Sequence, residues 1–425
     1  MVLKKKIYLL SNKNLFKMKP HSKYLFVCIL FFSVFISQAQ DSIRFDETGL
    51  ESVIQRSKVE KKPVFYMIYA NWCVYCNNIK KNVLKDPEVI NYMNANYIFA
   101  GLDFEKPGSE DFKTKYKVKT FPTFIVLDEN GIELARLTGE LKKEKFLSEA
   151  KLALNPKQQL PFLKAEYEND KTNGIALMRY LIALKKGNER KELNPIAHDY
   201  FEKVADDKMV NEVNWKIFTN GVTDIESREY KFVITNQQAF AAITSQKRVN
   251  DKFVNSVVEL LKPIVKTNDT ANYTKQRAIA KMITAPVIDS LLFQYDLDHY
   301  ETNKDWTQYK KVASANINKF VWNSPKEIKS IVLNVMRNSS DAPSLNQSLS
   351  WIKHSNELEE SYDGLLLEAR VQRKLNNIPV AITMTKKAKA YSDSMGWDGK
   401  EADKLLADLM IRKKAIAKPV AKPKK

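Results

Sequence analysis

Cysteine and histidine are among the residues that this chain has least of. Its 425 residues include three cysteines and four histidines. One cysteine, Cys28, lies in an N-terminal segment that we expect to be removed, so the mature chain would carry Cys73 and Cys76 alone. A single pair excludes the disulfide framework that stabilises many small secreted domains.

The scarcity of histidine also argues against a structural zinc site. Such a site takes four ligands, usually two cysteine pairs or a cysteine pair with a histidine pair. His198, His299 and His354 are far apart in the sequence and well downstream of the cysteines. We therefore expect no metal, and we interpret the three histidines as surface or helix-packing residues.

Apolar runs of membrane-spanning length are missing. The run Leu25–Ile36 is too short to span a membrane convincingly. It follows a basic stretch and precedes Ser37-Gln38-Ala39, which is the pattern of a secretory signal with its cleavage site. We predict a signal peptide over residues 1–39, with Met18 as an alternative start, export to the periplasm, and no stable membrane insertion after cleavage.

Acidic residues are outnumbered by basic ones. The chain has 69 lysines and arginines against 50 acids, a formal net charge of +19. Removing residues 1–39, with seven lysines and no acids, leaves 62 basic residues and a charge of +12. These lysines are spread out and no nucleic-acid motif is present, so we expect a solvated surface and no nucleic-acid partner. Residues 412–425 predict a basic disordered tail.

The most informative residues present are Cys73 and Cys76. Two thiols three residues apart can share a helical turn, close into a disulfide and pass two electrons to another protein. The apolar run 64–69 predicts a buried strand before them, and 77–84 predicts a helix after them. Cys73 would lie near the helix N-terminus, where N–H groups and the helix dipole stabilise a thiolate, and Cys76 would be more shielded.

A second motif lies further along the chain. Residues 120–127 predict a strand with Pro122 at its entry, followed by a turn and the alternating strand 132–137. Taken with the cysteine pair, this arrangement resembles the thioredoxin superfamily. The resemblance implies that Pro122 is a cis-proline beside the disulfide and that Phe121 offers backbone to an extended substrate.

The resemblance covers residues 44–155 and implies an α/β thioredoxin fold, a central mixed sheet flanked by helices. This part of the chain is similar in detail to the thioredoxin-like periplasmic domain of transmembrane thiol:disulfide interchange proteins. The shared residues are Lys62-Pro63-Val64, the run 69–74 and Asp86-Pro87-Glu88-Val89. It implies no cofactor beyond the redox-active disulfide. The implied site residues are Cys73 as nucleophile, Cys76 as resolving thiol, Pro122 as cis-proline, and Trp72, Phe121 and Thr123 for substrate binding.

Two positions depart from the family pattern. Thioredoxins place a buried acid six residues before the first cysteine, where this chain has Met67. The interchange-protein domain has an acid four residues after the second cysteine, where this chain has Lys80. Lys80 could stabilise a thiolate, but we interpret it as a solvated lysine on an exposed helix face. The direction of electron flow stays open.

Residues 156–411 predict a larger, all-helical domain. Glycine is scarce there and strand-like alternation is nearly absent. Helical spacing places two sets of residues on apolar faces. One set is Phe253, Val254, Val257, Val258 and Leu261, and the other is Ile175, Met178, Leu181 and Ile182. We expect the core of this region to include Trp215, Trp306, Trp322, Trp351 and Tyr362, and we expect a linker at 157–161.

The last helices resemble tetratricopeptide helix pairs. Ser348–Ile352 and Ala381–Met384 lie 33 residues apart, close to the period of that repeat. A generic helical bundle explains the spacing equally well. Stacked pairs would offer a concave surface to a partner.

These features predict a thiol–disulfide oxidoreductase of the cell envelope. It would act on protein or peptide thiols and disulfides, with a second protein as electron donor or acceptor. The alternative is an envelope scaffold whose helical domain binds a partner and whose thioredoxin-like domain is a docking module. Met67 and Lys80 give this alternative weight.

Overall fold

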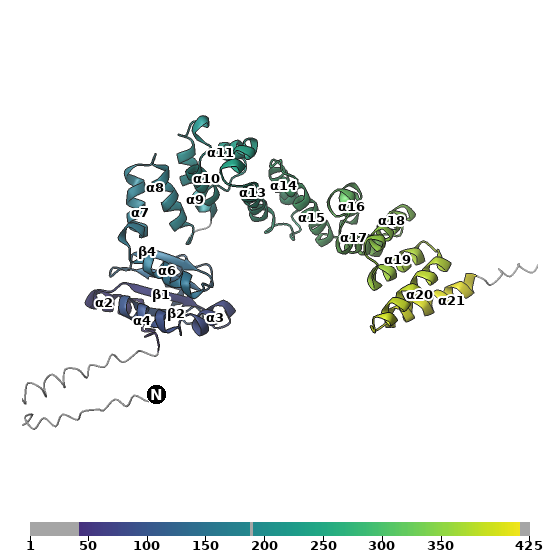
Figure 1. Ribbon diagram of the computed structural model, residues 1–425, viewed down its shortest axis with the longest axis horizontal. Coiled ribbons are helices and arrows are strands. Elements are labelled where there is room, and N and C mark those ends of the chain that lie inside the picture. The colour runs from purple at the N-terminus through teal and green to yellow at the C-terminus, as the bar shows by residue number, and fades with distance from the viewer. Residues whose placement is uncertain (1–41, 188–189, 417–425) are drawn as a thin grey trace, which may run out of the picture. The chain divides into compact units, whose positions relative to one another are not determined.

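The computed structural model describes residues 42–187 and 190–416 (Figure 1). The chain divides into two compact units between residues 188 and 189. The first contains a sheet with its helices, and residues 190–416 of the second contain helices without a strand. The predicted signal peptide 1–39, with Met18 and Cys28, lies outside the described residues.

A four-stranded mixed sheet forms the centre of the first unit. Its strands lie in the order β2-β1-β3-β4, with β2 parallel to β1 and with β3 antiparallel to both of its neighbours. The strands are β1 (Val64–Tyr69), β2 (Ile98–Asp103), β3 (Thr123–Leu127) and β4 (Glu133–Thr138). This is the sheet that the sequence predicts, although β3 begins after Pro122 rather than before it.

Helices cover both faces of this sheet. They are α2 (Leu50–Glu60), α3 (Val74–Asn82), α4 (Pro87–Asn96), α5 (Ser109–Lys115) and α6 (Lys143–Ala153). Successive side chains of a strand point to opposite faces. Phe65 and Met67 of β1 therefore pack with α3, α4 and α6, whereas Tyr66 and Ile68 pack with α2 and α5.

The segment before α2 packs along β2. The backbone of Asp46 bridges to Ala100, and its amide donates to the Phe99 carbonyl at 2.9 Å. The ring of Phe45 lies over Gly101, where a Cβ atom would come within 1.8 Å of it. Glycine is therefore required for this close approach.

Two helices after the predicted domain boundary belong to the first unit. They are α7 (Leu160–Asn169) and α8 (Gly174–Leu184), reached through the short helix η1 (Pro156–Gln158). Helix α7 packs against β4. Lys186 donates to Glu149 of α6 at 2.9 Å, and a Cβ on Gly187 would lie 2.8 Å from Arg136 Nε of β4. The division predicted at 155/156 thus differs from that of the structure, and the predicted linker 157–161 contains the end of η1, a bend at Gln159 and the start of α7.

The predicted apolar face of α8 is partly wrong. Ile175 and Ile182 are 58% and 40% exposed. The buried residues of this helix are Ala176, Leu177, Tyr180 and Leu181. Because α8 is apolar on almost every side, its sequence period does not select one face.

The second unit is a succession of helices. Neighbours in the chain pack together, as in the pairs α15–α16, α17–α18 and α19–α20. Many begin at a capping side chain or at a proline, which suits the first turn because it has no N–H to donate. The helices are α9 (Arg190–Phe201), α10 (Glu212–Gly221), α11 (Arg228–Thr235), α12 (Gln237–Ile243), α13 (Gln246–Leu261), α14 (Thr270–Ala280), α15 (Pro286–Thr302), α16 (Trp306–Phe320), α17 (Pro325–Asn338), α18 (Ala342–Leu358), α19 (Tyr362–Lys374), α20 (Ile378–Ser394) and α21 (Lys400–Ile416), with the short helix η2 (Asp206–Lys208).

The core of the second unit contains some of the residues that the sequence places there, whereas Val254, Val258, Trp306, Trp322 and Tyr362 are only partly buried. Phe253, Val257 and Leu261 of α13 are fully buried, and Trp215 and Trp351 are nearly so. Helix α21 continues to Ile416, so the first residues of the predicted tail are helical, and 417–425 lie outside the described residues. The tetratricopeptide-like character stays a prediction.

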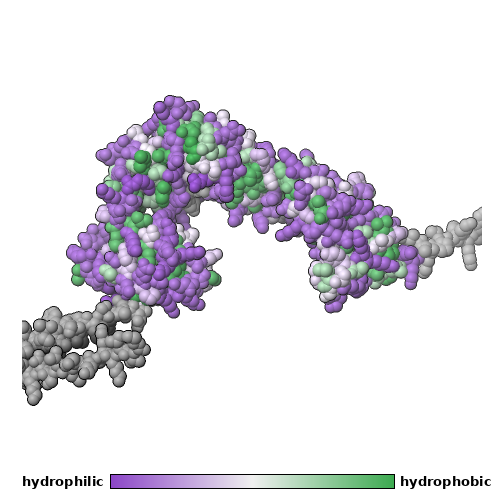
Figure 2. All heavy atoms as spheres, in the orientation of Figure 1, coloured by the Kyte–Doolittle hydropathy of each residue, from purple (hydrophilic) through white to green (hydrophobic). Residues whose placement is uncertain are grey.

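The described surface is largely polar. Figure 2 shows hydrophilic residues over most of the face that it draws, with apolar residues in small, separate groups. Among residues 42–187 and 190–416, the helices are all too short or too polar to cross a membrane.

Candidate active site

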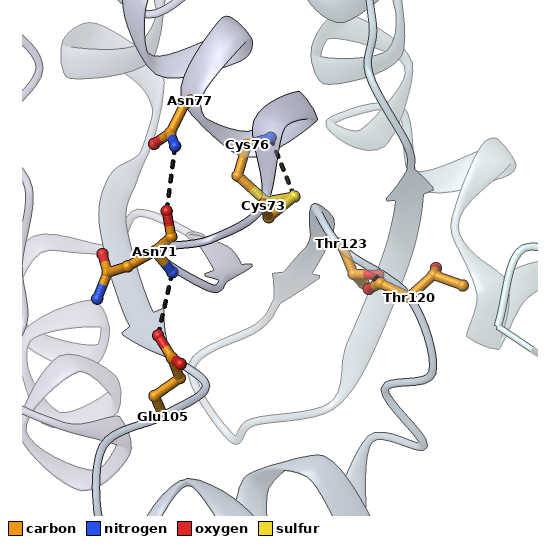
Figure 3. Close-up of a disulfide and its surroundings, with 7 residues drawn as sticks. All are labelled: Asn71, Cys73, Cys76, Asn77, Glu105, Thr120 and Thr123. Atoms are coloured by element: carbon orange, nitrogen blue, oxygen red, sulfur yellow. Dashed lines mark hydrogen bonds between the residues drawn. A yellow bond between two sulfur atoms is a disulfide. The ribbon is translucent and has the colours of Figure 1, made fainter.

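The two cysteines lie at the N-terminus of α3, immediately after the loop that leaves β1 (Figure 3). They form a disulfide with Cα atoms 5.3 Å apart. Cys73 is the N-cap, and its sulfur accepts a hydrogen bond from the Cys76 amide at 3.2 Å. Cys73 is 5% exposed and Cys76 is fully buried. The predicted helix terminus and the greater shielding of Cys76 are both present.

The loop before β3 carries the proline of the second motif. The Phe121–Pro122 peptide bond is cis, the isomer that the resemblance implies. The Pro122 carbonyl accepts a hydrogen bond from the Gly139 amide at 2.9 Å. Within the described residues, the backbone amide and carbonyl of Phe121 have no hydrogen-bond partner. An extended chain could pair with them.

Aromatic side chains lie next to the cysteines in the chain and pack against the cluster that contains them. Trp72 is 67% exposed, and its ring stands edge-on to that of Phe121, with centroids 6.1 Å apart. Phe121 in turn meets Phe104 at 4.3 Å. Val74 and Tyr75, between the two cysteines, are also exposed. The predicted substrate residues Trp72 and Phe121 therefore lie together beside Cys73.

Thr123 differs from its predicted role. Its side chain is 1% exposed, and its hydroxyl donates to the Thr120 carbonyl at 2.7 Å. The side chain therefore closes the turn into β3 instead of facing a substrate (Figure 3). Strand β3 begins at this residue, and its side chain is buried there.

Asn71 holds the loop between β1 and the cysteines. Its side-chain amide donates to Asp103 at 2.8 Å, and its backbone amide donates to Glu105 at 3.3 Å. Its carbonyl accepts from the Asn77 side chain at 3.1 Å (Figure 3). These contacts tie the loop to the end of β2 and to α3. Asp103 is 7% exposed, so this carboxylate is a buried anchor of the loop.

Lys80 is not the solvated lysine that the sequence suggested. It is half-buried, and its Nζ lies 3.0 Å from the centroid of the Tyr69 ring. The Tyr69 hydroxyl donates to Glu47 at 2.9 Å. Burial lowers the pKa of Lys80, and the carboxylates of Glu47 and Asp103 oppose this change. Burial and the bond to Glu47 raise the pKa of Tyr69.

A family model of a thioredoxin-like domain matches residues 50–153. These residues form a thioredoxin-like domain. The match lies within the first unit and includes β1 to β4, both cysteines and the cis-proline. The helices α7 to α21 lie outside it.

Curated relatives resemble this thioredoxin-like part. Thiol:disulfide interchange protein DsbD of Haemophilus ducreyi is 29% identical over 24% of this chain and 19% of its own length. Disulfide bond reductase DsbH of Chlamydia pneumoniae is 23% identical over 20% of this chain and 57% of its own. The chain thus spans about a fifth of the former and just over half of the latter.

A solved structure is similar to about a quarter of this chain. The solution structure of a thioredoxin from Thermus thermophilus is 23% identical to this chain. The alignment covers 27% of this chain and 90% of that one, with a TM-score of 0.25.

The thioredoxin-like domain has an apolar residue where its family places a buried acid. Met67 is fully buried and lies between Gly101 of β2 and Phe124 of β3 in the sheet register. The buried carboxylate nearest in the strand register is Asp103, which pairs with Tyr69 across β1 and β2. Asp103 is engaged by Asn71, so it acts on the loop.

Two histidines of the second unit stack on aromatic rings, and the third contacts a carboxylate. The His299 ring is fully buried and stacks on Tyr273 at 3.9 Å, and His354 stacks on Trp322 at 3.7 Å. His198 contacts Glu229 at 3.2 Å. Among residues 42–187 and 190–416, no three histidine, cysteine or acidic side chains come together as metal ligands would.

Sequence reasoning missed the contacts that support the cysteines from a distance. Glu47 lies before α2, Asp103 is the last residue of β2, and Phe104 follows it. The one signal in the sequence was the polar Asn71 at the mouth of the motif. An asparagine beside a reactive loop suggests hydrogen bonding to the backbone or to a carboxylate.

Proposed function

We propose that this protein is a thiol–disulfide oxidoreductase of the cell envelope that exchanges disulfides with protein substrates through Cys73 and Cys76. The observation that carries the proposal is the disulfide at the N-terminus of α3, on the same side of the domain as the cis Phe121–Pro122 bond. A thiol at a helix N-terminus has a lowered pKa and is a good nucleophile. The names of the relatives DsbD and DsbH support the same class of chemistry.

In the reductive direction, the exchange has two steps. The Cys73 thiolate attacks a substrate disulfide, forms a mixed disulfide and releases one substrate thiolate, which takes up a proton. Cys76 then loses its proton and attacks the Cys73 sulfur, which forms the Cys73–Cys76 disulfide and releases the second substrate thiolate. The substrate gains two electrons and the dithiol loses two. A dithiol protein, as electron donor, then reduces the Cys73–Cys76 disulfide again. The same two steps in reverse order oxidise a substrate.

The surface beside Cys73 suits an extended polypeptide. The backbone of Phe121 can pair with a substrate strand, as in β-strand addition. Trp72 and Phe121 provide an apolar surface for the residues that flank the substrate cysteine. The buried Cys76 is then reached only through Cys73, which orders the two steps.

Location and partners form the wider part of the proposal. The signal-like segment 1–39 supports export to the periplasm, where disulfide exchange between proteins takes place. The site requires no cofactor besides its own disulfide. We assign the helices of the second unit to holding or selecting the client protein, and we expect neither nucleic acid nor stable membrane insertion in the mature protein.

The decisive experiment is the reduction of insulin by dithiothreitol. We expect the full chain without residues 1–39 to accelerate insulin reduction, and Cys73→Ala to lower the rate to that of dithiothreitol alone. Circular dichroism and the unfolding midpoint of the variant check that it is folded. Equal rates for the two proteins would reject the oxidoreductase and favour the scaffold, for which the buried Met67 is the supporting observation.

A trapping experiment assigns the two thiols. Cys76→Ser should accumulate mixed disulfides through Cys73, because the second step is blocked. Cys73→Ser should accumulate far fewer, because Cys76 is fully buried. Non-reducing electrophoresis after incubation of each reduced variant with oxidised clients measures the mixed disulfides that it forms. Equal trapping by the two variants would reverse or remove the assigned roles.

A further inference from the structure

One charged group of the active-site helix takes no part in the exchange as described so far. Lys80 follows Cys76 by four residues on α3, so the two side chains lie on one face of the helix, one turn apart. Side chains in a helix lean toward its N-terminus, which here is the end that carries the disulfide. The Lys80 side chain therefore leans toward the end of α3 that carries the cysteines.

Tyr69 holds this ammonium group at the active-site end. Lys80 Nζ lies 3.0 Å from the centroid of the Tyr69 ring, a cation–π contact. Tyr69 ends β1 and begins the loop to Cys73, and it belongs to the same buried cluster as both cysteines. Its hydroxyl is fixed by the bond to Glu47. The ring is thus anchored at both ends of its side chain.

The charged groups that face Lys80 come from other segments. Glu47 before α2 and Asp103 at the end of β2 attract it, and Lys106 repels it. Lys106 pairs with Glu47 at 3.2 Å, and Asn71 donates to Asp103 at 2.8 Å, so both carboxylates are engaged by other donors. Among the described residues, no carboxylate lies within ion-pair distance of Lys80. Its positive charge is therefore only partly offset.

We propose that Lys80 is a positioning residue of the dithiol, whose ammonium group stabilises the thiolate of the reduced Cys73–Cys76 pair. A positive charge near a thiol lowers its pKa. Stabilising the thiolate favours the reduced dithiol over the disulfide and makes the pair a weaker reductant. Met67 adds to the effect, because at that position there is no buried carboxylate to oppose the thiolate. The catalytic meaning of this inference rests on the proposed function, but the electrostatic effect does not.

The first test is the pH profile of alkylation of the reduced full chain by iodoacetamide. Lys80→Met should move the profile to higher pH by about half a unit or more, because the thiolate loses a nearby cation. Lys80→Arg keeps the charge and should stay near the wild-type profile. The matched control is Lys81→Met, which removes the same charge from an exposed position one residue further along α3.

The second test is equilibration with glutathione. The reduced fraction of Lys80→Met at a fixed glutathione ratio should fall, with the equilibrium constant changing by about threefold. If Lys80→Met does not fold, Lys80→Gln replaces it in both tests. The inference is overturned if a neutral Lys80 variant has the same alkylation pH profile and the same glutathione equilibrium constant as Lys81→Met.

The two proposals can fail separately. A protein whose alkylation profile shifts as expected, but which does not reduce insulin, would reject the oxidoreductase and leave the role of Lys80 intact. Insulin reduction that depends on Cys73, together with an unshifted Lys80→Met profile, would leave the oxidoreductase and reject the role of Lys80.

Discussion

The two units use buried polar side chains in different ways. In the first, the buried Asp103 at the end of β2 accepts a hydrogen bond from Asn71 and so holds the loop that carries the cysteines. In the second, Asp296 of α15 accepts two hydrogen bonds from Arg277 of α14, both at 2.6 Å. The contacts of Asp103 support the redox-active cysteines, whereas the Arg277–Asp296 pair joins α14 to α15. Reactivity and stability should therefore respond to different mutations.

The largest expected effect is a loss of stability in the second unit, caused by Arg277→Ala, with no change in the reactivity of the first. Asp296 is 5% exposed and would lose its charged partner, keeping only the Tyr273 hydroxyl at 2.8 Å. Removing one partner of a fully buried ion pair costs about 3–5 kcal/mol. Because Arg277 is itself 36% exposed, solvent screens the pair. We therefore expect the variant to lose about 2–3 kcal/mol of its free energy of unfolding.

Urea unfolding followed by tryptophan fluorescence measures this loss, since Trp215, Trp306, Trp322 and Trp351 all lie in the second unit. The rate of thiol alkylation of the reduced protein should stay at the wild-type value. A changed alkylation rate would show that the two units are coupled and that the comparison fails.

A smaller effect, on reactivity more than on stability, is expected from Asn71→Ala. The buried carboxylate of Asp103 would lose a donor, at a cost of about 1 kcal/mol. The loop before Cys73 would lose its tie to β2, so insulin reduction should slow severalfold because the thiols are less well positioned. Asn82→Ala, at an exposed position on the same helix as the cysteines, is the matched control. Equal rates for the two variants would contradict the role of Asn71.

The smallest effect is a pH dependence within the second unit. The hydrogen bond to Glu229 raises the pKa of His198 above its ordinary value, so protonated His198 is favoured in the folded state. Its contribution to stability is therefore present below the unfolded pKa of about 6.5 and is lost as the pH rises through the higher folded value. The difference in unfolding midpoint between wild type and His198→Gln should be greatest near pH 5.5 and shrink toward pH 8. A constant difference would show that His198 acts by packing alone.

The sequence predicted what depends on neighbours in the chain. The cysteine pair at the start of α3, the cis bond before Pro122 and the mixed sheet follow from local patterns and from the family that shares them. The position of Lys80 could not be predicted, because it depends on Tyr69 from β1 and on Glu47 from a segment before α2. Contacts between residues so far apart are set by the fold, and helical spacing alone left Lys80 on an exposed face.

Two other errors have a similar cause. The hydrophobic periodicity of α8 does not indicate which side of the helix is buried. Tertiary packing buries Tyr180 and leaves Ile175 exposed. The domain boundary was placed where the family pattern ends. The contacts of Gly187 with Arg136 and of Lys186 with Glu149 instead hold α7 and α8 to the first unit.

The packing of Asp46 on β2 and of α7 on β4 has a practical consequence for anyone who expresses the domain alone. A fragment trimmed to the family match, residues 50–153, would remove both coverings from the two outermost strands of the sheet. Uncovered strands offer backbone groups to other chains and promote aggregation. A fragment of residues 42–187 keeps the outer strands β2 and β4 covered. It is therefore the better starting point for work on the thiol chemistry of the isolated domain.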